Sequence, residues 1–248
     1  MEISSDVNVI FAYIEETDRF HVPVVVFLSP YKRAGYYILL DQVKTSFIYT
    51  YSDFLRDTCT FIEKSIIDYR ESRSGILKKP SPFLINSVMR QKIKDRIEKS
   101  VDKNDARYDT INRFVKKLLT EYSIVLLYEN RDKLAEFRIK YLEMAEKEAD
   151  SAISRFLRKF KDFEVINFAD VENFDEWLEK LKKSELRIFN NKRDYEDMRI
   201  AAQYIGYNDK IKRLGFATCD KEFYRSLEKI ISYFKLTAGK LSLITLKR

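Results

Sequence analysis

Residues 191–223 read NKRDYEDMRIAAQYIGYNDKIKRLGFATCDKEF. An acidic cluster opens this stretch, and apolar residues then recur at helical spacing up to a turn at Gly206, which predicts an amphipathic helix. Beyond a basic loop, the short apolar segment 214–217 predicts a strand that stops at an acidic turn, where a second helical pattern begins. The stretch therefore predicts the order helix, strand, acidic turn, helix.

The composition favours a folded and mostly helical chain. Of its 248 residues, 45% are hydrophobic, so one large domain or two small ones can bury a core. Five Gly and four Pro are few for this length, which disfavours long flexible linkers and an all-β sandwich with many tight turns.

The charge balance suits a polyanionic partner without requiring one. Lys and Arg number 46 against 39 Asp and Glu, a net charge of +7, and 14% of the residues are aromatic. Basic side chains gain by releasing counterions from phosphates, and aromatic rings stack on unpaired bases. A well-solvated surface of mixed charge has the same composition, so composition leaves both interpretations open.

Several classes of site are disfavoured by the residues present. Cys59 and Cys219 are far apart in the sequence and form neither a disulfide framework nor a CxxC metal site, and the single histidine, His21, cannot build a His-rich metal site. No signal-peptide pattern opens the chain, and no apolar run reaches the roughly 18 residues of a membrane span. We therefore expect a cytoplasmic protein with no membrane partner.

Five β-prone segments alternate with helical patterns along the chain. Strands are predicted near residues 2–6, 36–40, 164–168, 214–217 and 241–246, the last as an edge strand. Strands separated by helices indicate an α/β fold with a small parallel sheet flanked by helices.

The middle of the chain is predicted to be helical. Helical patterns cover residues 41–69, with or without a break near Ser52, and residues 83–100, 106–122 and 131–160. Basic residues are frequent in these patterns; in the second of them, Arg90, Lys92, Lys94 and Arg96 are the candidates for contact with a nucleic-acid backbone. The alternative is a solvated helix face.

Two acids follow predicted strands. Asp6 ends the first strand, and Asp220 follows the strand at 214–217. The carboxyl ends of parallel strands meet at one edge of a sheet, where open α/β sheets place their ligand groups, so these two carboxylates are expected to converge. The alternative for Asp6 is that it only caps the helix that follows.

A third acid, Asp197, stands near the beginning of the helix that precedes this strand. Ile200, Ala201 and Tyr204 lie three, four and seven residues further on, so Asp197 continues the core-facing stripe of that helix. A capping box with Asp194 as N-cap and Asp197 at the third helical position explains the same spacing. Spacing alone does not choose between a site and a cap.

A hard divalent cation is one reason for such acids to converge. Mg²⁺ and Mn²⁺ prefer a few carboxylate oxygens and several waters, and a water on the ion loses its proton easily and can attack phosphorus in line. Acids without His or Cys suit this chemistry and argue against structural zinc.

Three motifs of the chain resemble those of the PIN-domain family. Residues 6–10, DVNVI, resemble the family's D-T-N-V-L opening; residues 197–202, DMRIAA, resemble its D-x-x-I-A-A helix start; residues 217–223, ATCDKEF, resemble its A-T-x-D-x-D-F turn. They occur in the family's order, and the resemblance covers roughly 1–70 and 164–246. It implies a single PIN-like, Rossmannoid three-layer domain over 1–248, with a helical insertion at 76–163.

The resemblance also implies a function and a site. PIN domains are typically metal-dependent ribonucleases, so Asp6, Asp197 and Asp220 are expected to be the catalytic ligands of Mg²⁺ or Mn²⁺. Glu196 is a further candidate ligand. Thr218 and Asn8 are expected to support the site. RNA is the implied partner, and the resemblance is compatible with a homodimer or an antitoxin-like protein partner.

The chain departs from the family pattern at Ser46, where a further acid is usual. Asp41, Asp53 or Asp57 can substitute for that acid, and Glu196 can approach from the other side. This departure keeps a second hypothesis open, a PIN-fold RNA-binding or scaffold protein without catalysis. A third hypothesis is a helical protein-interaction domain in which the acids are only helix caps.

Overall fold

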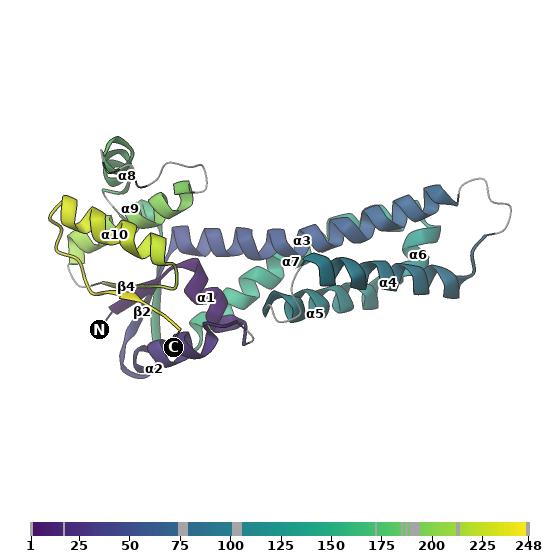
Figure 1. Ribbon diagram of the computed structural model, residues 1–248, viewed down its shortest axis with the longest axis horizontal. Helices are drawn as coiled ribbons and strands as arrows, with labels where there is room; N and C mark the ends of the chain where they lie inside the picture. Colours follow the sequence, from purple (N-terminus) through teal and green to yellow (C-terminus); the bar gives the residue numbers. More distant parts are fainter. Residues whose placement is uncertain are drawn as a thin grey trace. The chain divides into compact units, whose positions relative to one another are not determined.

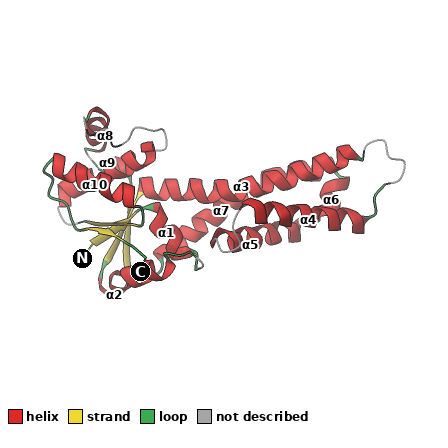
Figure 2. Ribbon diagram, viewed as in Figure 1, coloured by secondary structure: helices red, strands yellow, loops and turns green. Residues whose placement is uncertain are grey.

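The computed structural model describes residues 2–16, 18–73, 79–100, 106–171, 173–184, 186, 188, 194–211 and 214–246. The chain forms two compact units. The first, here called the sheet unit, consists of Met1–Ile48 and Ser151–Arg248, and the second, the helical unit, is Tyr49–Asp150. In Figure 2 the strands belong to the sheet unit, and the regular structure of the helical unit is helix.

The sheet unit is built on a parallel sheet, as the alternation of strands and helices predicts. Its described strands are β1 (Glu2–Ser5), β2 (Tyr36–Leu40), β3 (Asp162–Ile166), β4 (Gly215–Thr218) and β5 (Leu241–Leu243). Their order is β3-β2-β1-β4-β5 with every neighbouring pair parallel, so β1 is central and β5 is at an edge. The expected α/β class, the parallel sheet and the edge position of the last strand are confirmed.

Helices of the sheet unit follow nearly every strand. They are α1 (Val7–Ile14), α2 (His21–Ala34), the beginning of α3 (Asp41–Ser72), the end of α7 (Arg131–Leu157), the 3-10 helix η1 (Phe168–Asp170), α8 (Phe174–Lys183), α9 (Asp194–Ile211) and α10 (Lys221–Tyr233). In Figure 1 these helices lie between successive strands along the chain.

Helices pack on both faces of the sheet. Ile3 is paired with Tyr37, and the next residue of β1, Ser4, is paired with Phe216, so the two aromatic rings point to opposite faces. The Tyr37 ring stacks on Phe160 beyond α7, with ring centroids 4.5 Å apart. On the other face, Phe216 contacts the Tyr204 ring of α9 at 4.9 Å. These buried aromatic contacts form the core of the unit.

At Gly239 the chain passes very close to the backbone at Leu214. A Cβ atom at Gly239 would lie 2.1 Å from the carbonyl oxygen of Leu214, which precedes β4. Only a residue without a side chain fits there, so Gly239 sets the path by which the chain enters β5.

The helical unit contains most of α3 and α7, together with α4 (Pro82–Ser100), α5 (Ala106–Glu121) and α6 (Ile124–Glu129). Helix α3 runs without a break through Ser52, whose hydroxyl donates to the carbonyl of Tyr49 within the same helix. A buried carboxylate in this unit, Glu63, is paired with both Nε and Nη2 of Arg138 at 3.1 and 2.8 Å. A buried acid is thus neutralised by a guanidinium within the unit.

Some boundaries differ from the sequence-based expectations. Strand β3 begins two residues earlier than predicted, and the turn of helix at α6 was not predicted. The helical unit spans 49–150, and the helical insertion expected at 76–163 stays a prediction. Among the described residues, no helix is long and apolar enough to span a membrane.

Candidate active site at the carboxyl edge of the sheet

The strand order places a topological switch point beside β1. From β1 the chain passes to β2 on one side, and it later enters β4 on the other side. Ligands of open α/β sheets bind outside the carboxyl ends of the strands at such a point. Asp6 directly follows β1 and Asp220 lies two residues beyond the end of β4, so both acids flank it.

Asp6 is held rigidly at the end of β1. Its backbone N–H donates to the carbonyl of Ala217 at 3.1 Å, which extends the pairing of β1 with β4 by one residue. Its carboxylate caps α1, because Oδ1 accepts from the N–H of Val9 at 2.9 Å, while Oδ2 accepts from the hydroxyl of Thr218. The side chain is 3% exposed.

Thr218 connects the two acids. Its buried hydroxyl donates to Asp6 and accepts from the backbone N–H of Asp220 at 2.8 Å. Asp220 in turn caps α10 through Oδ1, which accepts from the N–H groups of Glu222 and Phe223 at 2.7 and 3.0 Å. Within the described residues, the other oxygen of Asp220 makes no hydrogen bond, so it remains available to a ligand.

Helix α9 presents Asp197 from its first turn. The described part of this helix begins at Asp194, and Asp194, Glu196 and Asp197 are the acids of its first turn. Asp197 is half-buried. The position of α9 is fixed by buried Gln203, whose amide accepts from the N–H of Gln42 at 3.0 Å and donates to the carbonyl of Ile166 at 2.9 Å.

The three carboxylates act on one another electrostatically. Burial raises the pKa of Asp6 to about 7; the hydrogen bonds from Thr218 and Val9 oppose this, and the charges of Asp220 and Asp197 add to it. Burial also raises the pKa of Asp197 to about 6, followed by the charges of Asp220, Asp194 and Glu196. In the described part of the chain, none of Asp6, Asp197 and Asp220 forms an ion pair with Lys or Arg.

Glu196 approaches the position where the family pattern has its missing acid. The hydroxyl of Ser46, in the first turns of α3, donates to Oε2 of Glu196 at 3.2 Å. Ser46 is largely buried, while Glu196 is exposed. Of the acids that sequence offers as substitutes, Glu196 is therefore the one that contacts Ser46, and Asp53 and Asp57 are exposed residues of the helical unit.

The donor atoms fit a hard cation, but they are not gathered into a closed coordination shell. Among the residues that the structure describes, no group of three or more His, Cys, Asp or Glu side chains lies close enough together to hold a metal ion. Mg²⁺ is commonly held through one or two carboxylates with waters completing its octahedron, so a cation here would need only some of these acids as direct ligands.

The remaining predicted site residues are exposed. Asn8 lies in the first turn of α1. In the helical unit, Arg90 and Lys94 share one side of α4 because they are four residues apart, and Lys92 and Arg96 share another. Lys92 and Arg96 lie over the rings of Tyr69 and Phe61 at 5.7 and 5.1 Å. The four basic residues therefore do not form one stripe.

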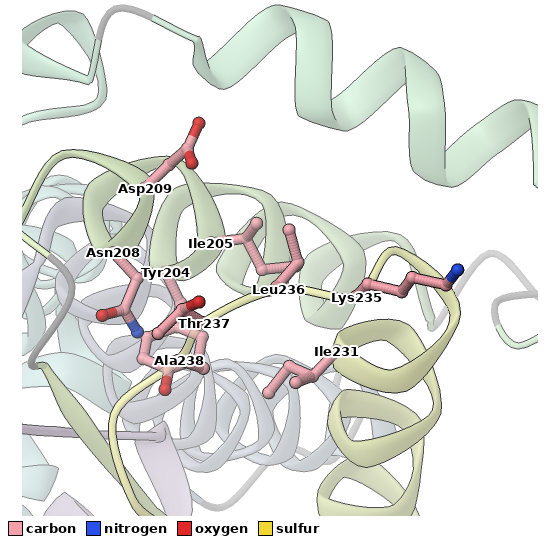
Figure 3. Close-up of a pocket in the computed structure, with 9 residues that line it drawn as sticks. All are labelled: Tyr204, Ile205, Asn208, Asp209, Ile231, Lys235, Leu236, Thr237 and Ala238. Atoms are coloured by element: carbon pink, nitrogen blue, oxygen red, sulfur yellow. The ribbon is translucent and has the colours of Figure 1, made fainter.

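A cavity lies away from the acids, near the carboxyl ends of α9 and α10. Its volume is about 190 Å³, and Figure 3 shows its lining residues, among them Tyr204, Leu236 and Thr237. Tyr204 and Asn208 both donate hydrogen bonds to the carbonyl of Leu214 at 3.1 Å, so part of the polar lining already has partners. The cavity is smaller than the roughly 300–1,000 Å³ of typical ligand pockets.

Sequence reasoning missed one feature of this edge, an exposed tyrosine flanked by two cations. Tyr195 and Arg199 are four residues apart, a spacing that is visible in the sequence, but the second cation, Lys182, comes from α8. Only the tertiary structure brings it to the same ring.

Comparisons of the chain with protein-family models, curated proteins and solved structures find no match.

Proposed function

We propose that this chain is a PIN-like ribonuclease that cleaves RNA phosphodiester bonds with Mg²⁺ or Mn²⁺ held by Asp6, Asp197 and Asp220. Glu196 is proposed as a further ligand on the Ser46 side. The proposal is supported by the motif resemblance together with the placement of the acids at the switch point of a parallel sheet.

One observation carries the proposal: within the described residues, Asp6, Asp197 and Asp220 form no ion pair with Lys or Arg. Glu63, a buried carboxylate of the helical unit, is paired with Arg138, whereas Asp6 is as deeply buried and its donors among the described residues are neutral, Val9 N–H and the Thr218 hydroxyl. Two further carboxylates act on Asp6 with the same sign of charge. A buried, unpaired carboxylate beside like charges either keeps its proton, as the raised pKa of Asp6 indicates, or recruits a cation, so the edge is suited to one.

The chain's own residues then have separate roles. Thr218 fixes the orientation of the Asp6 carboxylate and the backbone of Asp220, so both acids remain at the edge of the sheet without an ion. Gln203 fixes α9 and thereby the position of Asp197. A bound Mg²⁺ or Mn²⁺ would supply an activated water and offset charge on the phosphate.

Helix capping is the strongest competing explanation of the acids. Asp6 and Asp220 do cap α1 and α10. Capping, however, is served equally well by Ser, Thr or Asn, and it does not require burial of a charge. Asp197 lies in the first turn of α9, where the helix dipole also favours a negative charge.

An RNA-binding or scaffold protein without catalysis is the second candidate function, and Ser46 is the observation that favours it. A hydroxyl stands where the family has an acid, and the nearby carboxylate of Glu196 is exposed. This candidate retains the fold and RNA as partner but predicts no cleavage.

Two assays separate these explanations. Labelled single-stranded RNA is incubated with Mg²⁺ or Mn²⁺ and either wild type, Asp6→Asn or Asp162→Asn, the last a matched change at an exposed position where β3 begins. The nuclease proposal predicts cleavage by wild type and Asp162→Asn but not by Asp6→Asn. Intact RNA with every protein and both metals refutes it.

Thermal melting with Mn²⁺ tests the cation itself. A ligand present at 100 times its Kd stabilises the folded state by about 2.7 kcal/mol. Stabilisation of wild type that is lost in Asp220→Asn supports a metal site, with or without catalysis. Equal melting curves with and without Mn²⁺ leave only the capping explanation.

A further inference from the structure

Tyr195 is an exposed aromatic residue in the first turn of α9, next to Glu196 in the sequence. Its side chain is 43% exposed, whereas Tyr204, further along the same helix, is fully buried. A tyrosine ring exposed beside charged residues offers a flat apolar face to a ligand.

Two cations lie over this ring at long cation–π distances. Nζ of Lys182, from the last turn of α8, and the guanidinium carbon of Arg199, one turn along α9, lie 6.0 and 5.9 Å from the ring centroid. Tight pairs elsewhere in the sheet unit are shorter, as for Lys180 over Trp177 at 4.5 Å. The looser approach and the exposure of Tyr195 leave ring surface open for another planar group.

Helix geometry places this ring close to the acids but on a different side of α9. Tyr195 precedes Asp197 by two residues, so the two side chains are about 200° apart around a helix roughly 10–12 Å wide. Tyr195 continues the stripe of Gly206, where a Cβ atom would meet Val171 and Trp177, so it lies at the end of the α8–α9 contact. The ring therefore lies on the side of α9 opposite to Asp197.

We propose that Tyr195, Lys182 and Arg199 form a docking platform for a single-stranded RNA, on which one base stacks on the tyrosine ring while the two cations contact the adjoining phosphates. This rests on the proposed function, because it assigns the substrate of that site as single-stranded. Arg199 forms no ion pair within the described residues. Lys182 is paired with Glu179 at 2.9 Å at the surface, a contact weak enough for a phosphate to replace.

Unpaired bases are the groups that fit such a ring. Stacking of a base on an aromatic side chain tolerates any sequence, because every base has a flat face. Bases in a duplex are already stacked on their neighbours, so an isolated ring on a helix surface offers them little. The platform therefore discriminates single strands from duplexes and does not read sequence.

Fluorescence anisotropy with labelled 12-nucleotide RNA in EDTA tests the platform without cleavage. We expect Tyr195→Ala to weaken binding of the single strand by about 5- to 150-fold, the range for one stacked base. Tyr195→Phe should bind as wild type, and an oligonucleotide with abasic sites should bind wild type and Tyr195→Ala alike. A duplex of the same sequence should show no effect of Tyr195→Ala.

Variants of Lys182 and Arg199 test the phosphate contacts, and a variant of another exposed tyrosine serves as a control. Lys182→Ala and Arg199→Ala should each weaken intact and abasic RNA equally and reduce the slope of log K against log salt by about 0.7. Tyr233→Ala, at a tyrosine 51% exposed that ends α10, should change nothing. Circular dichroism confirms that each variant is folded.

Affinity for the intact single strand that is unchanged in Tyr195→Ala, or an equal loss for the duplex, overturns the platform. Failure of the platform and failure of the nuclease are distinguishable. Cleavage that depends on Asp6 but not on Tyr195 removes the platform and leaves the nuclease. Binding that depends on Tyr195 with no cleavage in any metal removes the nuclease and leaves an RNA-binding surface.

Discussion

Replacing Asp6 by Asn should stabilise the protein in the absence of divalent cations. The pKa of Asp6 rises from 3.8 to about 7 in the folded chain. Between these values the folded state holds a proton that the unfolded state has released, so stability falls as the pH rises through this window. An asparagine does not ionise and therefore does not undergo this loss.

The magnitude follows from the two pKa values. At about 1.4 kcal/mol for each pH unit between them, ionised Asp6 costs the folded state about 4 kcal/mol at pH 8. Asparagine can retain the local hydrogen bonds: Oδ1 still accepts from Val9, and the amide donates to Thr218, whose hydroxyl has lone pairs for both this donor and Asp220 N–H. We therefore expect up to about 4 kcal/mol of stabilisation at pH 8 and almost none at pH 4.

Denaturant unfolding of wild type and Asp6→Asn in EDTA, at pH 4, 6 and 8, measures this difference. Asp162→Asn serves as the control, because Asp162 is exposed at the beginning of β3. With saturating Mn²⁺ at pH 8, wild type should recover stability and the variant should not. If Asp6→Asn is less stable than wild type at pH 8 in EDTA, Asp6 is a favourable structural cap and the reasoning is wrong.

Four further predictions concern single positions. Thr218→Val, which removes the hydroxyl shared by Asp6 and Asp220, should destabilise the protein by about 1–3 kcal/mol in urea unfolding, whereas Thr218→Ser should not. Gly239→Ala places a methyl group 2.1 Å from the carbonyl oxygen of Leu214 and should lower the free energy of unfolding by more than about 2 kcal/mol; an unchanged value would refute the close approach. Glu196→Gln, which can keep its contact with Ser46, should leave the melting temperature in EDTA unchanged and weaken Mn²⁺ binding by calorimetry; equal affinity would exclude Glu196 as a ligand. Burial raises the pKa of both Cys59 and Cys219 to about 12, so neither thiol should react with iodoacetamide at pH 8 until the chain is unfolded, as mass spectrometry would show.

Most regular elements of the sheet unit were predictable because their signals are local, but the turn predicted at Gly206 is wrong, since α9 continues through it to Ile211. Strand β2 coincides with the β-prone run at 36–40, and Asp6 lies at the end of β1, as the step from apolar to polar residues predicts. Strand β3 was misplaced by two residues because it is an edge strand: its first three residues are exposed, so the apolar pattern that marks a buried strand is missing.

The site was only partly predictable because its contacts join distant segments. The parallel direction of the predicted strands placed Asp6 and Asp220 at one edge of the sheet, whereas the order of the strands required the structure. The bond from Thr218 to Asp6 spans 212 residues and that from Ser46 to Glu196 spans 150, and neither leaves a local pattern. The basic residues of α4 show that residues close in sequence can also be separated. They form one run in the sequence, but they lie on two sides of the helix.

Anomalous diffraction from crystals soaked in Mn²⁺ tests the central claim most directly. The metal-site account predicts one ion between Asp6, Asp197 and Asp220, with each carboxylate bound at roughly 2.1 Å or through one water. Absence of an anomalous peak at this edge under saturating Mn²⁺, with both capping interactions intact, would contradict it.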